Sequence, residues 1–466
     1  MPDCVKISTT SGPDRTLVLV AVLAISAGVG GLAGGIYIDL ARMAAVAALV
    51  IQIIVELRGG RKEFMTSPLF LLSAVGVIFF SAVQAIWGQE ALHTKALDLT
   101  VFIGSRAEAI ILAFGMAGLL FYLLASRKNK RDAAVIPKLV NGIVVSLFVL
   151  TAAVSFFDIA LYTPSILAPP VSSFIAPFIV KASFIIPPVI SLSLCLLVRY
   201  AQTRGRYFRI AVFILAIAAL GALAYAHEGK LVMFILFAVS LYTIRLLDFS
   251  FSHMVLALLT ALLVTLAFVQ IVQHTRWKVT GGSDRESSSY FRIFKSKGVW
   301  RQTETGYCLG NVLKAHANEP FDLSKQAFWI EGLVPRILWP GKPSLSSGQK
   351  YAVDYCSKRP KYLGKHSASI TLLGQPVIKG GIIGLVIHAG LLLFVLAAIE
   401  RFNANPAALS AAMITALLPW LIDFDQDFSL YVANAVKFAM VMAFLFIPIS
   451  MIERRIEGDN LERGQL

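Results

Sequence analysis

The 466-residue sequence has little charge and almost no cysteine. Charged residues make up 15% of the chain, whereas a soluble globular protein carries about 25%, and there are only 4 cysteines. Long apolar runs take their place, because 57% of the residues are hydrophobic and the mean hydropathy is +0.74. A soluble enzyme with one membrane anchor is therefore excluded, and the composition predicts an integral membrane protein.

Motifs that bind nucleotides or metals are also missing. The chain has no Gly-x-Gly-x-x-Gly fingerprint, no Walker A loop and no Asn-x-Ser/Thr acceptor, and its His and Cys residues show no zinc-ligand spacing. We therefore expect chemistry without a nucleotide, a metal or another cofactor. The formal net charge of +15 is first explained by cytoplasmic loops that set orientation, so a nucleic-acid partner is not expected.

Long apolar runs predict a bundle of about twelve transmembrane helices, because backbone groups in lipid must be satisfied within the segment. The predicted spans are 16–37, 41–57, 67–87, 105–125, 139–161, 179–198, 209–226, 231–247, 254–273, 379–399, 407–422 and 431–452. The pairs joined at 36–41 and 227–230 can each also be one long or re-entrant segment. This pattern divides an all-α chain into nine spans (1–274), a large extracytoplasmic segment (275–378), three spans (379–452) and a tail (453–466).

Basic residues gather in short loops on one side of this predicted bundle. They cluster at 58–62, 127–131, 199–209 and 454–455, whereas the opposite short loops hold chiefly Arg42, Lys95, Arg106 and Lys230. The asymmetry predicts that both termini lie in the cytoplasm. The first span has no basic flank on its amino-terminal side with a small-residue cleavage site close behind it. We therefore expect a retained signal anchor.

The segment 275–378 carries roughly sixteen Lys and Arg against seven Asp and Glu. Long loops do not follow the orientation rule, so this surplus reports on a partner. It fits either a basic face that rests on anionic lipid headgroups or a site for a polyanionic or pyrophosphate-bearing ligand.

Cys308 and Cys356 both lie in this segment, on the side of the membrane that oxidises thiols. They are either a disulfide or two unpaired small residues. A disulfide would close a loop of roughly 50 residues and constrain the unfolded chain by about 4 kcal/mol.

The string Glu331-Gly-Leu-Val-Pro-Arg-Ile-Leu-Trp-Pro-Gly-Lys-Pro-Ser344, in the last large outward segment, resembles the Wzy-type O-antigen and exopolysaccharide repeat-unit polymerases. The Gly-rich stretch Lys379-Gly-Gly-Ile-Ile-Gly384 before the next span is similar to one in some relatives, although Gly374-Gln375-Pro376 stands where many carry a Glu and an aromatic residue. The resemblance implies a GT-C-like glycosyltransferase of the bacterial inner membrane. Such an enzyme moves a growing glycan from one polyprenyl pyrophosphate onto a second lipid-linked unit, in some cases beside a chain-length regulator.

A departing pyrophosphate needs cations, and Arg presents two parallel donors to phosphate oxygens. Arg336 is the first candidate for this pyrophosphate contact and Lys342 the second, and Trp339 lies between them. The alternative is that Arg336 contacts a lipid headgroup and Trp339 is an interfacial anchor. Ionisable residues at the outer ends of predicted spans are further candidates, although Arg106 and Glu108 can equally pair across the bundle. These residues are Arg106 with Glu108, Lys230 with Glu228, and Lys181.

An acceptor hydroxyl reacts faster beside a base. The outward groups that qualify are Glu331, His366, Glu228 and the cluster Asp423, Asp425 and Asp427, and the sequence does not choose among them. His388, inside a predicted span, is better explained as a packed helix-interface residue.

Two other functions remain open. A ligase that joins finished glycan to a lipid core would share the bundle, the basic segment and the donor. A flippase or transporter also has about twelve spans, and Pro187-Pro188 is the one broken-helix feature that favours it.

Overall fold

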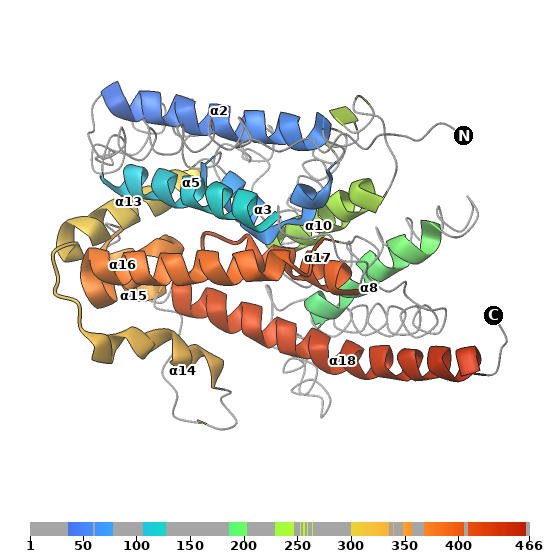
Figure 1. Ribbon diagram of the computed structural model, residues 1–466. Helices are drawn as coiled ribbons and strands as arrows, with labels where there is room; N and C mark the ends of the chain where they lie inside the picture. The colour runs from blue at the N-terminus through green and yellow to red at the C-terminus, as the bar shows by residue number, and fades with distance from the viewer. Residues whose placement is uncertain are drawn as a thin grey trace, which may run out of the picture.

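The computed structural model describes residues 36–58, 61–77, 106–126, 186–202, 229–246, 300–334, 348–356, 368–404 and 409–462, together with Trp339 and five isolated positions between 252 and 263. All regular elements within these ranges are helices, and none is a strand (Figure 1). The predicted all-α class is thereby confirmed for this part of the chain.

The elements, in chain order, are α2 (Ile36–Arg58), η1 (Glu63–Thr66), α3 (Pro68–Val77), α5 (Arg106–Ser126), α8 (Ile186–Gln202), α10 (Gly229–Leu246), α13 (Trp300–His316), η5 (Leu323–Trp329), α14 (Ile330–Leu333), α15 (Gly348–Asp354), α16 (Thr371–Glu400), α17 (Leu409–Leu421) and α18 (Phe428–Glu462). Here η1 and η5 are 3₁₀ helices. The predicted outward segment therefore contains regular helices as well as loops.

Three of these helices are long and apolar enough to cross a membrane, namely Leu40–Leu57 of α2, Ala107–Ala125 of α5 and all of α16. Shorter apolar helices of 10–17 residues lie in α3, α8, α10, α17 and α18. The described part of the chain is thus all-helical, with three helices that by length and composition could span a membrane. Predicted spans at 139–161 and 209–226, and most of those at 16–37 and 254–273, lie outside the described residues, so the number twelve stays a prediction.

The start of α2 corrects the predicted loop at 36–41, because Ile36 already begins the helix. Arg42, expected among the outer-loop charges, lies inside α2 and is buried. Its Nε and Nη2 atoms donate to the two carboxylate oxygens of Glu108 in α5, at 2.5 and 2.7 Å. This two-bond ion pair explains how a charge stays in an apolar bundle.

At the other end of the chain, α18 continues to Glu462, ten residues past the predicted end of the last span at 452. Most of the predicted tail is therefore helical. α17 and α18 are joined by the short link 422–427, which contacts Thr305 of α13 through Asp425.

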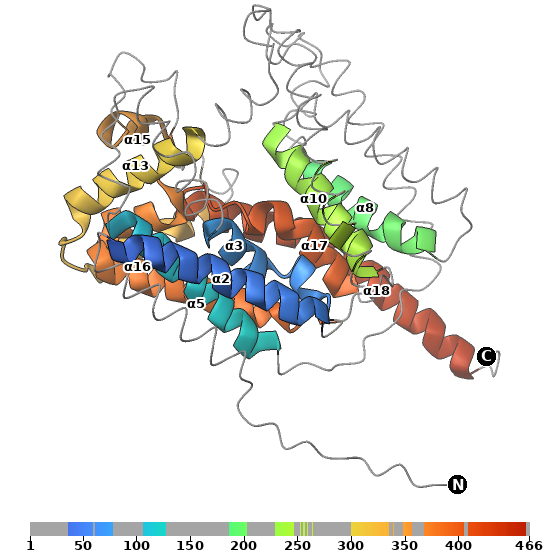
Figure 2. The ribbon, with the colours of Figure 1, turned by 90° about the horizontal axis from the view of Figure 1, so that it is seen from above.

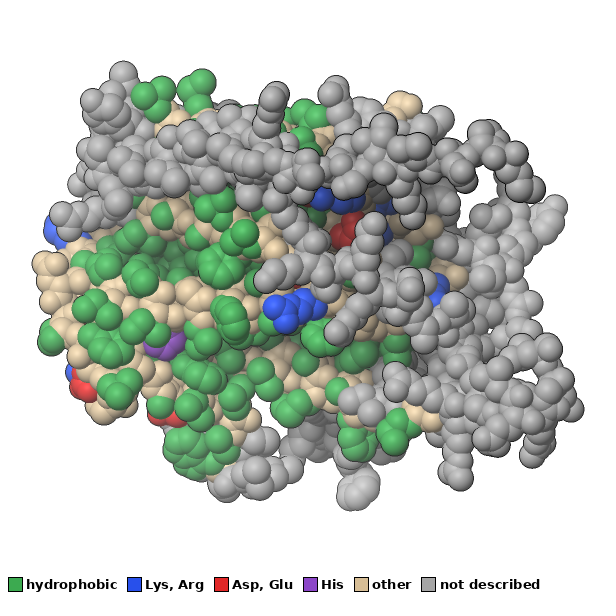
Figure 3. All heavy atoms as spheres, in the orientation of Figure 1, with side chains coloured by type: hydrophobic (Ala, Val, Ile, Leu, Met, Phe, Trp, Pro, Cys, Tyr) green, Lys and Arg blue, Asp and Glu red, His purple; other side chains and the backbone are tan. Residues whose placement is uncertain are grey.

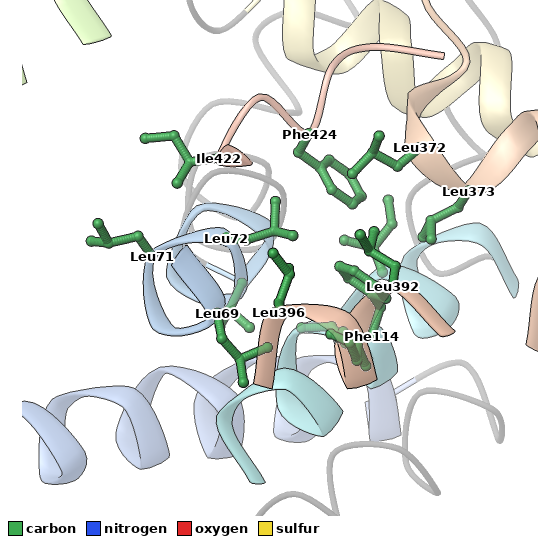
Figure 4. Packing of buried hydrophobic residues seen from close by; sticks show 14 of the residues in the cluster. Leu69, Leu71, Leu72, Phe114, Leu372, Leu373, Leu392, Leu396, Ile422 and Phe424 are labelled. Atoms are coloured by element: carbon green, nitrogen blue, oxygen red, sulfur yellow. The ribbon is translucent and has the colours of Figure 1, made fainter. Parts of the chain in front are cut away.

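A hydrophobic core forms where α3, α5, α16 and the link 422–427 meet (Figure 4). Leu72 of α3, Phe114 of α5 and Leu392 and Leu396 of α16 point into it beneath Phe424 of the link. The rings of Phe114 and Phe424 have centroids 5.9 Å apart. The link is therefore anchored to two helices that can cross the membrane.

A second cluster joins α8, α10, α17 and α18, and α8 and α10 lie away from α13 and α15 (Figure 2). Cys195, Tyr242 and Trp420 are buried in it, and the Trp420 ring lies 4.3 Å from that of Phe438. The two clusters share α17 and α18, so the described helices form one packed body.

Polar side chains connect the ends of three predicted spans, and the sequence predicts all three ends to be cytoplasmic. Arg245, at the end of α10, donates to Thr66 Oγ1 at 2.5 Å and to Asn403 Oδ1 at 2.7 Å. Ser67 donates to the Glu400 carboxylate at 2.5 Å. Segments that follow the second, eighth and tenth predicted spans therefore meet at one end of the bundle.

The helix α16 is broken at two glycines. Gly380 has φ −160° and ψ 24°, and Gly381 has φ 60° and ψ −154°. Beyond the break, the Ile382 amide donates to the carbonyl of Ala317 at 3.2 Å instead of continuing a regular helix. The expected start of the tenth span at Lys379 falls on this break, and α16 itself begins eight residues earlier, at Thr371.

The break predicts opposite effects for two glycine-to-alanine changes in the same helix. A Cβ at Gly381 would lie 2.4 Å from the Glu319 carbonyl oxygen, at a positive φ that only glycine adopts freely. Gly381→Ala should therefore lower the unfolding free energy by roughly 2 kcal/mol or more. Thermal unfolding of the purified protein in detergent measures this.

Gly390→Ala is the matched control, because a Cβ there meets no atom within 4 Å. It should unfold at the wild-type temperature or slightly above it, since alanine favours the helix. Equal unfolding temperatures for both variants would contradict the described break.

Candidate functional site

A surface pocket of about 330 Å³ lies where η5, α14 and α16 meet. Its walls combine two lysines and one carboxylate with apolar and aromatic side chains. The lining residues are Ser324, Lys325, Ala327, Phe328, Ile330, Glu331, Val334, Trp339 and Lys379. A concave site with a few charged groups among apolar ones is the usual form of a small-ligand site.

One wall of the pocket is η5, and the side chain of Asp322 caps its first turn. Asp322 accepts hydrogen bonds from the Ser324 hydroxyl at 2.7 Å and the Ser324 amide at 3.0 Å. These two bonds hold the pKa of Asp322 below its usual value. The Lys325 ammonium lies 3.6 Å from the same carboxylate, so its charge is partly balanced before any ligand binds.

A second wall of the pocket is Lys379 of α16, just before the break in that helix. Gln326 Nε2 donates to the Lys379 carbonyl at 3.0 Å and to the Asp322 carbonyl at 2.7 Å. A regular helix would use the Lys379 carbonyl internally, so the break at Gly380 makes this contact possible. The break thus fixes η5 against α16 and positions Lys379 at the pocket.

Phe328 of the pocket lining belongs to a group of packed rings. Phe328 packs against His388 and Phe428, with ring centroids 5.1 and 6.0 Å apart. His388 is buried, and its Nδ1 lies 2.8 Å from the Gly384 carbonyl within the same helix. His388 is therefore a helix-interface residue, as the sequence predicts.

The structure brings two of the predicted site residues together, because Glu331 and Trp339 line the same pocket. Arg336, Lys342, His366, Glu228 and Lys181 lie outside the described residues.

Two predicted cations have only their backbone described: Arg106 begins α5 and Lys230 lies in the first turn of α10, while their side chains lie outside the described part. Glu108, the proposed neighbour of Arg106, binds Arg42.

Two pocket residues, Lys325 and Lys379, were given no role by the sequence. The signal for Lys379 was present, since it directly precedes Gly380-Gly381 at a predicted membrane boundary. A broken helix at such a boundary commonly builds a binding site. No comparable signal marks Lys325 among the basic residues of the segment 275–378.

Cys308 and Cys356 form a disulfide, with their Cα atoms 4.8 Å apart. It joins α13 to the residue pair that follows α15. Nearby, the Asn311 side chain donates to the Tyr355 carbonyl at 2.8 Å, and His316 Nε2 lies 2.8 Å from the Tyr355 hydroxyl. The bridge closes a 48-residue separation that contains η5, α14 and the described pocket residues of this segment.

The three aspartates of the link 422–427 are buried, although the sequence suggested outward groups available as bases. Asp425 accepts a hydrogen bond from Thr305 of α13 at 3.2 Å, and Asp423 accepts one from Gln426 at 2.6 Å. Asp427 is 6% exposed, and its Oδ1 atom has no hydrogen-bond partner among the residues that the structure describes. Among the described residues, no three metal-ligating side chains are grouped to share an ion.

No protein-family model, no curated protein and no solved structure matches this chain.

The buried aspartates predict a specific pH dependence of stability. Burial, and then the negative charge of Asp425, raise the pKa of Asp427 to about 7 from an ordinary 3.8. A hydrogen bond from the Ile370 backbone amide acts in the opposite direction and lowers this pKa. The folded state therefore holds this proton more tightly than the unfolded chain, and the resulting stability is lost as pH rises from about 4 through 7.

Asp427→Asn cannot ionise, so its unfolding free energy should exceed that of the wild type above neutral pH by roughly 1–3 kcal/mol. The difference should close near pH 4. Thermal unfolding across this pH range is the measurement, with the exposed Asp354→Asn as control. Parallel curves for wild type and Asp427→Asn would contradict a buried, proton-binding Asp427.

Proposed function

We propose that this chain is a bacterial inner-membrane polymerase that joins polyprenyl-pyrophosphate-linked oligosaccharide repeat units into a surface polysaccharide. The observation that carries the proposal is the identity of the pocket residues. Glu331, Val334 and Trp339 belong to the string that resembles the Wzy-type polymerases, and Lys379 opens the second stretch of that resemblance. Two separate parts of the sequence that resemble one family thus meet at one pocket.

In the proposed reaction, an acceptor sugar hydroxyl attacks the anomeric carbon of the donor glycan. The bond from that carbon to the pyrophosphate oxygen breaks, and the pyrophosphate leaves with the electron pair. It therefore needs positive charge and not a proton. Lys379 and Lys325 line the pocket, and Arg336 and Lys342 stand in the same string as its wall residues, so we assign these cations to the pyrophosphate.

The acceptor hydroxyl must lose its proton as the new glycosidic bond forms. Glu331 is the carboxylate in the pocket wall and is exposed, so it is our first choice as the base that takes this proton. His366 remains the second. Trp339 is 38% exposed at the pocket, which suits packing of its ring against the apolar face of a sugar.

The proposed arrangement is a twelve-span, GT-C-like bundle with both termini in the cytoplasm. The meeting of Thr66, Arg245 and Asn403 supports it, because the sequence assigns all three to the cytoplasmic ends of spans. The contact between Thr305 and Asp425 supports it at the outer end, where it joins the outward segment to the link after the eleventh predicted span. The pocket would then face the compartment in which lipid-linked units are joined.

A lipid-linked glycan flippase is the second candidate. The interruption of α16 at Gly380 and Gly381 favours it, since transporters bind substrates at broken helices. Such a protein would move single repeat units and would not join them.

The proposal predicts that Arg336 is needed for long chains. Loss of a contact that strengthens in the transition state should cost roughly 3 kcal/mol, or about a hundredfold in rate. Cells with Arg336→Ala at normal protein level should accumulate single repeat units, as polysaccharide gels will reveal. Arg336→Lys keeps the charge without the paired donors and should also be clearly impaired.

Lys350→Ala is the control, because Lys350 is an exposed cation of the outward segment that does not line the pocket. It should leave chain length unchanged. Polymer of wild-type length and amount in the Arg336→Ala strain would overturn the assignment of this residue.

A further inference from the structure

The carboxyl group of Asp427 is buried and takes no part in the proposed reaction. Acidic side chains reach the described surface at only a few points in Figure 3, among hydrophobic ones, and Asp427 itself is 6% exposed. Its Oδ1 atom has no hydrogen-bond partner among the described residues, and none of them forms an ion pair with it. A carboxylate there would have neither water nor a counter-ion, so the site favours the neutral, protonated group.

Two neighbours act directly on this carboxyl group. The Ile370 backbone amide, just before α16, donates a hydrogen bond to it, and the negative charge of Asp425 in the same link opposes its ionisation. Asp425 is held in turn by Thr305 of α13, whose hydroxyl lies 3.2 Å from its Oδ1 atom. Loss of the proton from Asp427 would therefore place two negative charges together inside the protein.

Other titratable groups around the link make their described contacts elsewhere. The His388 ring of α16 packs on Phe428, with ring centroids 5.2 Å apart. The Tyr431 hydroxyl of α18 donates to a backbone carbonyl of α17 at 2.7 Å, and Asp423 accepts a hydrogen bond from within the link. None of these three groups is among those that act on the Asp427 proton.

The residues that follow Asp427 support the wall of the pocket. Phe428 and Ser429 begin α18, and both contact Phe328, which lines the pocket. The Phe428 and Phe328 rings have centroids 6.0 Å apart, and the Ser429 hydroxyl donates to the Phe328 carbonyl at 3.4 Å. The Ser429 amide donates to the side chain of Gln375 at 2.8 Å. The first turn of α18 is therefore fixed to η5 and to α16 at once.

We propose that Asp427 is a proton switch that holds the pocket in its described shape. While its carboxyl group keeps the proton, the link 422–427 stays buried and the first turn of α18 supports Phe328. When the proton is released to solvent, the buried negative charges repel, the link moves toward water, and Phe328 loses its contacts with that turn. The wall of the pocket formed by η5 is therefore firm in acid and loose in alkali.

Hydrogen–deuterium exchange of the full-length protein in nanodiscs tests this. Exchange is followed by mass spectrometry between pH 5 and 8 in the segments 323–331 and 428–431, and is compared at each pH with Asp427→Asn, which removes the chemical effect of pH on exchange. The carboxyl group has a pKa of about 7 in place and an ordinary pKa of 3.8 once exposed. Opening of both segments should therefore increase roughly tenfold per pH unit between pH 5 and 6 and level off by pH 8.

Two matched variants and one distant helix serve as controls. Asp425→Asn keeps an oxygen for Thr305 but removes the neighbouring charge, so the increase with pH should be smaller. Asp354→Asn changes an exposed acid and should keep the wild-type profile. The helix α8, which packs in the second cluster, should show no such increase.

Equal pH profiles for the wild type and Asp427→Asn would overturn the proposal. An increase of the same size in α8 would also overturn it, because Asp427 would then affect only global stability. If Asp427→Asn does not fold, Asp425→Asn decides, and a wild-type profile in that variant would refute the switch. The measurement uses no substrate, so a confirmed switch in a protein that joins no repeat units would refute the polymerase proposal alone.

Discussion

The break of α16 at Gly380 and Gly381 is the constraint on which the site depends. It frees the Lys379 carbonyl, which accepts a hydrogen bond from Gln326, and the Ile382 amide, which donates to Ala317. Both bonds tie the segment 317–326 to a helix that is long and apolar enough to cross a membrane. A continuous helix would satisfy these groups internally and would remove both hydrogen bonds. The contact between η5 and the pocket end of α16 therefore depends on the break.

Three contacts hold the described helices between 300 and 356 together and against the bundle. The Cys308–Cys356 disulfide joins α13 to the end of α15, and the contact of Thr305 with Asp425 connects α13 to the link 422–427. Phe424 of that link packs on Phe114 within the helical bundle. The segment is thus held by a covalent bridge, a buried polar contact and an aromatic contact, which keeps the pocket walls in register with the membrane helices.

The all-α class of the described part and the pairing of Cys308 with Cys356 could both be predicted from the sequence. Composition and thiol location determine these two. The burial of Asp427 and the pairing of Arg42 with Glu108 could not be predicted, because each depends on which helix lies opposite. Hydropathy averages over a window, so it predicts which segments are apolar but not which side chains of different segments meet.

The polymerase proposal is tested most directly by reconstitution. The purified protein in liposomes is given polyprenyl-pyrophosphate-linked repeat units, with EDTA present, and the lipid-linked products are separated by size. A polymerase should give a ladder of products that differ by one repeat unit. Single units that stay unjoined, or that only cross the bilayer, would contradict it.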